Sequence, residues 1–279
     1  ANMLAAALKP HGGVVMWRAF VYAAGDKDRA KQAYEEFMPL DGKFADNVII
    51  QIKNGPIDFQ PCEPYSPLFT ALKQTRTMPE LQITMEYLGQ ERWLTFLAPQ
   101  WKRFMDESGV KGDYIAAVAN IGDDDDWCGS IFNQANLYAY GRLALDPSTS
   151  ARTIAEDWQT GTFGSRPATN MMLESWHNTV DAMMPLGLHH IFAGEHHYGP
   201  EPWYAPQGCR VDWTPPYYHK ADKKGIGFDR TEATGTGATA QYPEAFGKRV
   251  EDAKTCDEDY LLWFHHLPWT HRMKSGRTL

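Results

Sequence analysis

Four apolar runs in the first half of the chain constrain its fold more than any other feature. They are GVVMWRAFVY (13–22), DNVIIQIKN (46–54), LQITMEYLG (81–89) and YIAAVANIG (114–122). Each run is mostly apolar without strict alternation, which is typical of strands that are buried on both faces. Segments with helical patterns, such as 26–40 and 98–109, separate the runs. Strands that alternate with helices pair in parallel, so the sequence predicts an α/β fold.

The pattern changes after residue 122, and the rest of the chain reads as mainly helical. Three helical segments follow, at 130–147, 146–163 and 170–184. Ser150 is one of several residues suited to cap the second of them. Beyond these segments the chain is rich in Gly, Pro, His and Trp and shows no strand alternation. We therefore predict a boundary near Pro147, with an α/β part at 1–147 and a mainly helical C-terminal domain at 148–279.

Composition excludes some classes of protein. The formal net charge of −8 argues against a nucleic-acid-binding protein, because no basic patch outweighs the acids. No apolar stretch approaches the ~20 residues that span a membrane. The first residues lack a signal-peptide layout, and we favour a cytoplasmic or periplasmic location over secretion. The four cysteines form no CxxC motif, and we expect them to be reduced: Cys62, Cys128, Cys209 and Cys256.

Motifs for metals and nucleotides are weak throughout the sequence. Histidines occur in three neighbouring pairs, at 189–190, 196–197 and 265–266, but none has the HExxH spacing of a zinc site. The run DDDDWCGS (123–130) lacks the alternating ligands and final Glu of an EF-hand loop. TGTGATA (234–240) is not GxGxxG and follows no strand. We therefore expect neither a cofactor nor a metal.

Polar residues near the ends of the predicted strands are the candidates for chemistry, because a parallel α/β barrel has its active site at the C-terminal strand ends. A carboxylate pair there can take a proton from water, while Arg and Lys can bind an anionic substrate. The alternative is an ordinary ion pair between Arg18 and Asp58, with Glu86 capping a loop. The candidates are Arg18, Lys53, Asp58, Glu86 and, at the fourth run, Asn120 with Asp123.

Long blocks across the chain resemble the α-glucuronidases of glycoside hydrolase family 67. They are WRAFVY, QIKNGPIDFQPCEP, QITMEYLGQ, VANIGDDDDWCG, QANLYAYGRLALDP, PLGLHHIFAGEHHYGPEPW, DWTPPYYHKADKKGIGFDRT and LLWFHHLPWTHRMKSGRTL. The resemblance implies an inverting hydrolase that removes 4-O-methyl-D-glucuronic acid from decorated xylo-oligosaccharides. It also implies a (β/α)8 TIM barrel, of which residues 1–147 would supply strands five to eight, and a helical C-terminal domain that mediates homodimerisation.

The same resemblance assigns roles to individual residues. Asp58 and Glu86 correspond to the water-activating pair, and Arg18 and Lys53 to the residues that hold the carboxylate of the sugar. Trp213 corresponds, on a weaker match, to a Trp that lines the sugar pocket. An inverting enzyme needs its acid and base about 6.5–9.5 Å apart, which leaves room for the attacking water.

Three departures from the family pattern matter. The acid Glu of the family lies on an earlier strand, whereas the 17 residues before Arg18 contain no Glu. Cys62 stands where the family usually has Arg, and the stretch between Glu86 and Asn120 is shorter than usual. We therefore expect an internal fragment without its general acid, for which Glu63 or Glu195 is a poor substitute. The alternative is a non-catalytic homologue that binds uronate sugars or acts in assembly.

Overall fold

The computed structural model describes residues 1–21, 28–60, 62–86, 88, 94–110, 114–120, 130–183, 185–188 and 219–279. Asp123, Trp213, Glu195 and the histidines at 189–190 and 196–197 lie outside these ranges. Within the described part, no helix has the length and apolar character needed to cross a membrane.

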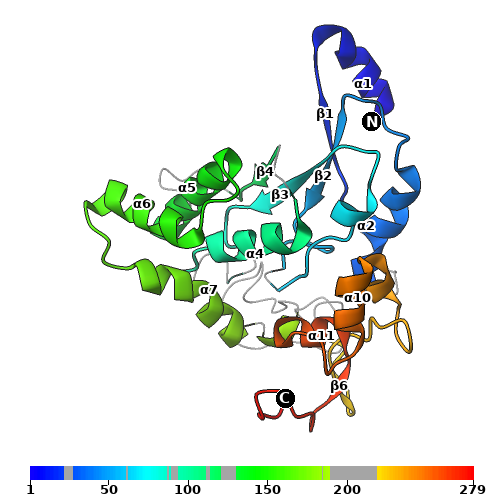
Figure 1. Cartoon of the computed structure of the whole chain (residues 1–279), viewed down its shortest axis with the longest axis vertical. Coiled ribbons are helices and arrows are strands. Elements are labelled where there is room, and N and C mark those ends of the chain that lie inside the picture. The colour runs from blue at the N-terminus through cyan, green and yellow to red at the C-terminus, as the bar shows by residue number, and fades with distance from the viewer. Residues whose placement is uncertain are drawn as a thin grey trace, which may run out of the picture.

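A four-stranded parallel sheet organises the first half of the chain (Figure 1). Its strands are β1 (Val15–Arg18), β2 (Val48–Lys53), β3 (Thr77–Gln82) and β4 (Ala116–Val118), and their order in the sheet is the order in the chain. All three strand pairs are parallel, with helices in the connections between strands. The predicted α/β fold is therefore confirmed.

The third strand lies elsewhere than the sequence indicated. The run at 81–89 was expected to be the strand, but β3 spans Thr77–Gln82 and includes Pro79. Proline lacks the N–H of a ladder bond and argues against a strand interior. Pairing with β4 begins only at Glu80, so the missing N–H of Pro79 interrupts no bond there. Glu86 consequently lies in the connection after β3 rather than within a strand.

Helices lie beside the sheet and make up much of the rest of the described chain (Figure 1). The N-caps are local: the Asp28 side chain accepts a hydrogen bond from the Ala30 amide, and Ser150 accepts one from Thr153. The helices are α1 (Asn2–Leu8), α2 (Arg29–Phe37), α3 (Leu68–Ala71), α4 (Ala98–Ser108), α5 (Ile131–Leu145), α6 (Ala151–Phe163), α7 (Thr169–Met183), α10 (Glu244–Glu251) and α11 (Leu261–Phe264). Short 3-10 turns include η3 (Pro185–Gly187), η5 (Ala238–Gln241) and η6 (Glu258–Tyr260).

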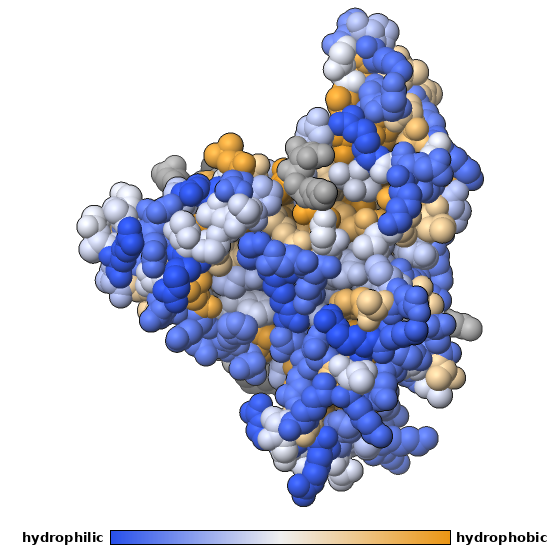
Figure 2. Space-filling model, viewed as in Figure 1, coloured by the Kyte–Doolittle hydropathy of each residue, from blue (hydrophilic) through white to orange (hydrophobic). Residues whose placement is uncertain are grey.

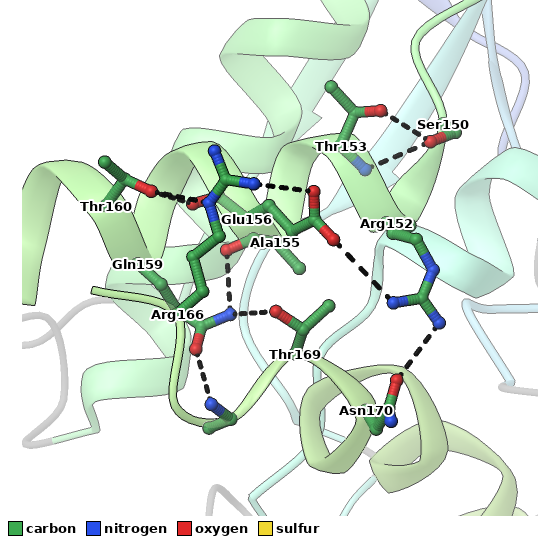
Figure 3. Close-up of polar contacts among 11 residues, drawn as sticks. Ser150, Arg152, Thr153, Ala155, Glu156, Gln159, Thr160, Arg166, Thr169 and Asn170 are labelled. Atoms are coloured by element: carbon green, nitrogen blue, oxygen red, sulfur yellow. Dashed lines mark hydrogen bonds and ion pairs between the residues drawn. The ribbon is translucent and has the colours of Figure 1, made fainter.

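A buried glutamine fixes the connection between α6 and α7 (Figure 3). Gln159 is fully buried, and its amide nitrogen donates to the carbonyl of Ala155 at 3.0 Å and to Thr169 Oγ1 at 2.9 Å. Its side-chain oxygen accepts from the Ala168 amide at 2.7 Å. On the surface, Glu156 lies between Arg152 and Arg166, which adds ion pairs of the exposed kind.

The main hydrophobic core runs through both halves of the chain. It contains Leu81 of β3 and Trp101 of α4 together with Trp158 of α6 and Trp263 of α11. A second cluster lies between the sheet and the helices α1, α2 and α3.

The predicted domain boundary near Pro147 stays a prediction. In contrast to the polar C-terminal region, apolar side chains reach the surface on the projection of α1 and β1 (Figure 2), where Met16 is 63% exposed.

The C-terminal region is joined to the sheet domain by a buried ion pair. Arg230, in the loop before η5, donates from Nε to Asp28 Oδ2 at 2.9 Å, and both side chains are almost fully buried. The guanidinium also donates to the carbonyl of Trp263 at 2.9 Å. A two-stranded antiparallel sheet, β5 (Gly225–Ile226) with β6 (Leu267–Pro268), completes this region.

Candidate active site

Arg18 ends β1 and is held by a carboxylate that the sequence did not single out. Its Nε and Nη2 donate to Oε2 and Oε1 of Glu80 at 2.8 Å and 2.5 Å. Glu80 is fully buried, whereas the Arg18 side chain is 47% exposed. Donation to the Glu80 carboxylate raises the pKa of the Arg18 guanidinium above its ordinary value. This bidentate contact with the buried carboxylate orients the guanidinium, and the rest of the Arg18 side chain remains exposed to solvent.

Lys53 ends β2 and contacts Asp58, five residues later. Its ammonium group also lies 3.6 Å from the ring centroid of Phe20 and 4.5 Å from that of Phe59. The Asp58 side chain is 27% exposed, so it remains accessible from one side. The alternative, an ordinary ion pair between Arg18 and Asp58, is wrong in its partners. Arg18 pairs with Glu80, and Asp58 pairs with Lys53.

Glu86 is tied to the end of β3. It accepts a hydrogen bond from Gln82 Nε2 at 2.6 Å, and Gln82 is the last residue of that strand. The next connection is fixed to the same place, because the amide of Asn120 donates to Thr84 Oγ1 at 3.0 Å. Both loops therefore stand at the C-terminal edge of the sheet.

The strand register brings these contacts to one face of the sheet. Arg18 pairs with Gln51 on β2, and Lys53 pairs with Glu80 on β3. Side chains two residues apart on a strand share a face, about 7 Å apart. Glu80, which holds Arg18, and Gln82, which holds Glu86, are two apart on β3. Four of the candidates are thus attached, directly or through one partner, to neighbouring positions of one polar face: Arg18, Lys53, Asp58 and Glu86.

Sequence reasoning missed Glu80, although a signal was present. The strands read as apolar without alternation, yet Gln51 and Lys53 alternate with isoleucines, and Glu80 and Gln82 flank Leu81. This period of two marks a polar face opposite an apolar one. A small cavity lies beside this face. It is lined by Asn54, Phe59, Gln82, Thr84, Met85, Leu88, Leu97, Gln100 and Trp101.

The described residues also show the surroundings of the histidines and cysteines singled out in the sequence. Among the described residues, no group of three His, Cys, Asp or Glu side chains gathers as a metal site. Of the paired histidines, His265 hydrogen-bonds to the carbonyl of Val250 and His266 to that of Gly227. Burial raises the pKa of both described thiols, Cys62 and Cys256, to about 12, and neither forms a disulfide. Trp213, Cys128 and Cys209 lie outside the described residues.

Comparison with known proteins gives a consistent picture. Residues 1–127 match the model of the glycosyl hydrolase family 67 middle domain, and residues 128–279 match that of the glycosyl hydrolase family 67 C-terminus. Alpha-glucuronidase A of Aspergillus tubingensis is 41% identical over 310 residues, and alpha-glucuronidase A of Emericella nidulans 42% identical over 314. Both alignments cover the whole of this chain but 36% of the relative. The alignments are longer than the 279 residues of this chain, so the relatives carry additional residues within the matched span.

Proposed function

The chain belongs to glycosyl hydrolase family 67, and from that premise we propose that it carries the water-activating and uronate-binding groups of an α-glucuronidase. The proposed substrate is (4-O-methyl)-D-glucuronic acid linked α-1,2 to a xylo-oligosaccharide. The names of the relatives support the activity. The observation that carries the proposal is the polar sheet face, on which Arg18, Lys53, Asp58 and Glu86 are attached to adjacent strand positions.

In the proposed reaction the two carboxylates act on water. Asp58 or Glu86 accepts a proton as the water oxygen attacks the anomeric carbon, and the glycosidic bond breaks on the opposite face with inversion. The xylose oxygen leaves with a proton from a general acid, a role that we assign to none of the described residues. The second carboxylate orients the water.

In the same scheme the cations recognise the uronate. Arg18 offers a fork whose geometry matches a carboxylate, and Glu80 holds that fork in place. Lys53 contacts the Phe20 ring and the Asp58 carboxylate, and its ammonium group can also attract the uronate. Trp213 is proposed to line the sugar pocket.

An activated substrate separates water activation from leaving-group protonation. The chain is assayed on 4-nitrophenyl α-D-glucuronide, whose nitrophenolate leaves without a proton, and on aldouronic xylo-oligosaccharides. We expect turnover of the aryl glucuronide, with kcat lowered ~10²–10⁴-fold in Asp58→Ala or Glu86→Ala. Arg18→Ala should instead mainly raise KM. The control Arg152→Ala changes an exposed arginine of α6 and should leave both constants unaltered.

The same assay distinguishes an α-glucuronidase from the alternative, a non-catalytic homologue. Binding of glucuronate without any turnover of the aryl glucuronide would favour a non-catalytic, uronate-binding homologue. Near-normal rates in both carboxylate variants would reject their catalytic role.

The architecture belongs to the same proposal. We infer that residues 1–147 form strands five to eight of a (β/α)8 barrel and that residues 148–279 form a helical C-terminal domain through which two copies dimerise. The sequential parallel order of β1 to β4 supports the barrel. Sedimentation equilibrium on the chain tests the dimer, and a monomer at all concentrations would reject it.

A further inference from the structure

The loop that carries Asp58 is built around a carboxylate. Glu63 is half-buried, and its Oε2 accepts from the Ile57 amide at 2.7 Å. Its Oε1 accepts from the amides of Asp58 and Gln60, each at 2.9 Å. Three backbone N–H groups that converge in this way form a concave anion site, and here the chain supplies its own anion.

Two further features show that the loop depends on this carboxylate. Phe59 has a φ of 55°, a left-handed conformation that costs a non-glycine residue ~1–3 kcal/mol. It separates the amides of Asp58 and Gln60, which both donate to Glu63 Oε1. Gly55 packs against Glu63 so closely that a Cβ there would overlap with the Glu63 carboxylate and its Cβ. The bonds to Glu63 offset the strain at Phe59, and the absence of a side chain at residue 55 leaves space for the carboxylate.

We propose that Glu63 is a positioning residue for Asp58: by binding the amides of residues 57, 58 and 60 it sets where the Asp58 carboxylate stands relative to Lys53. The structural part of this inference stands on the contacts alone, and its catalytic consequence rests on the proposed function. Glu63 thus acts through the backbone rather than as a proton donor, because both of its oxygens already face N–H groups.

The surroundings of Glu63 make its charge sensitive to pH. Burial raises the pKa of Glu63 to about 7, and the nearby charge of Asp58 adds to this, while the three amide bonds oppose it. Glu63 lines a second cavity, distinct from the one beside the polar sheet face. The other titratable groups of this second cavity are Cys62, Tyr65, Arg103 and Glu107 of α4, and Tyr260 of η6. A carboxyl whose pKa is higher in the folded loop than in the unfolded chain contributes stability that is lost as pH rises through the folded value. The amides of this loop should therefore be protected from hydrogen exchange less strongly as pH rises through about 7.

The test compares Glu63→Gln with Glu107→Gln. Glu107 lines the same cavity but bonds to Arg103 and to the Tyr260 hydroxyl, not to the loop, so its variant controls for loss of a carboxylate there. Amide hydrogen exchange of the 279-residue chain measures the loop directly. In Glu63→Gln we expect the amides of residues 57, 58 and 60 to exchange roughly 10- to 100-fold faster, as expected for losing charge-assisted bonds. Gly55→Ala should act in the same direction.

Two readouts separate positioning from a general structural role. In the unaltered chain, the protection factor of the Ile57 amide should fall as pH is raised through about 7, and this dependence should vanish in Glu63→Gln. On the aryl glucuronide, Glu63→Gln should lower kcat by up to about 10²-fold with little change in KM. Two results would overturn the proposal. One is unchanged exchange at the three amides in Glu63→Gln, and the other is a crystal structure of that variant in which Asp58 keeps its ion pair with Lys53.

The two proposals fail separately. If the unaltered chain turns over no aryl glucuronide, the proposed function of the isolated chain fails, and exchange and the variant crystal structure alone decide the role of Glu63. If the chain is active and Glu63→Gln retains full kcat, Glu63 has no positioning role for the reaction, while the function of Asp58 stands.

Discussion

Replacing Arg230 by Met should destabilise the fold far more than removing an arginine from an exposed ion pair. Arg230 is 1% exposed and its partner Asp28 2%. Arg230→Met retains much of the apolar contact with Phe228 and Trp263, whose rings lie 4.1 Å and 4.4 Å from the guanidinium. It leaves Asp28 buried without a counter-charge, and breaking a buried pair in this way costs ~3–5 kcal/mol.

A matched control is Arg142→Met. Arg142 pairs with Asp157 at 2.6 Å, but the two side chains are 32% and 39% exposed. Such pairs contribute ~0–1 kcal/mol. Urea unfolding at pH 7, followed by tryptophan fluorescence, gives the free energy of unfolding for each variant. The double variant Asp28→Asn with Arg230→Met should lose less stability than the sum of the single changes, because it leaves no unpaired charge.

The pH dependence follows from the sign of the shift. Burial opposes ionisation of Asp28, but Arg230 and the hydrogen bonds from Thr236 and Ala30 prevail and lower its pKa. A carboxyl with a lowered folded-state pKa contributes stability above its unfolded pKa of about 3.9 and loses that contribution as pH falls through the folded value. The difference in free energy of unfolding between the unaltered chain and Arg230→Met should therefore become smaller below pH ~4. If Arg230→Met costs no more than Arg142→Met at pH 7, the reasoning about the buried pair is wrong.

Two further predictions concern the helical part and the thiols. Gln159→Ala should lower the free energy of unfolding by ~1–3 kcal/mol, because it leaves the Ala168 amide without its acceptor, whereas the exposed Arg152→Ala should change it by less than ~0.5 kcal/mol; urea unfolding that ranks them equally contradicts this. Cys62 and Cys256 should react with a maleimide at pH 8 only after urea is added, because burial raises the pKa of both thiols to about 12. Rapid labelling of either in the folded chain, measured by peptide mass spectrometry, would refute the burial argument.

Local sequence determined several parts of this protein. Alternating apolar runs and helical segments were sufficient for parallel strands and an α/β fold, because burial and periodicity are local signals. The N-caps at Asp28 and Ser150 form with residues two or three positions away. The positions of Arg18 and Lys53 at strand ends followed from the same runs. The resemblance to a family assigned roles that composition and spacing left open.

The partners of these residues were decided by tertiary structure. Glu80 lies 62 positions from Arg18, and only the strand register brings them together. Pro79 is compatible with β3 because of where pairing with β4 begins. Asp28 caps α2 through its own neighbours, but its burial depends on Arg230, which lies 202 positions away. Local patterns specify which residues are polar and where strands end. A buried charge is stable only beside a partner that the folded chain brings to it, and no local pattern encodes that partner.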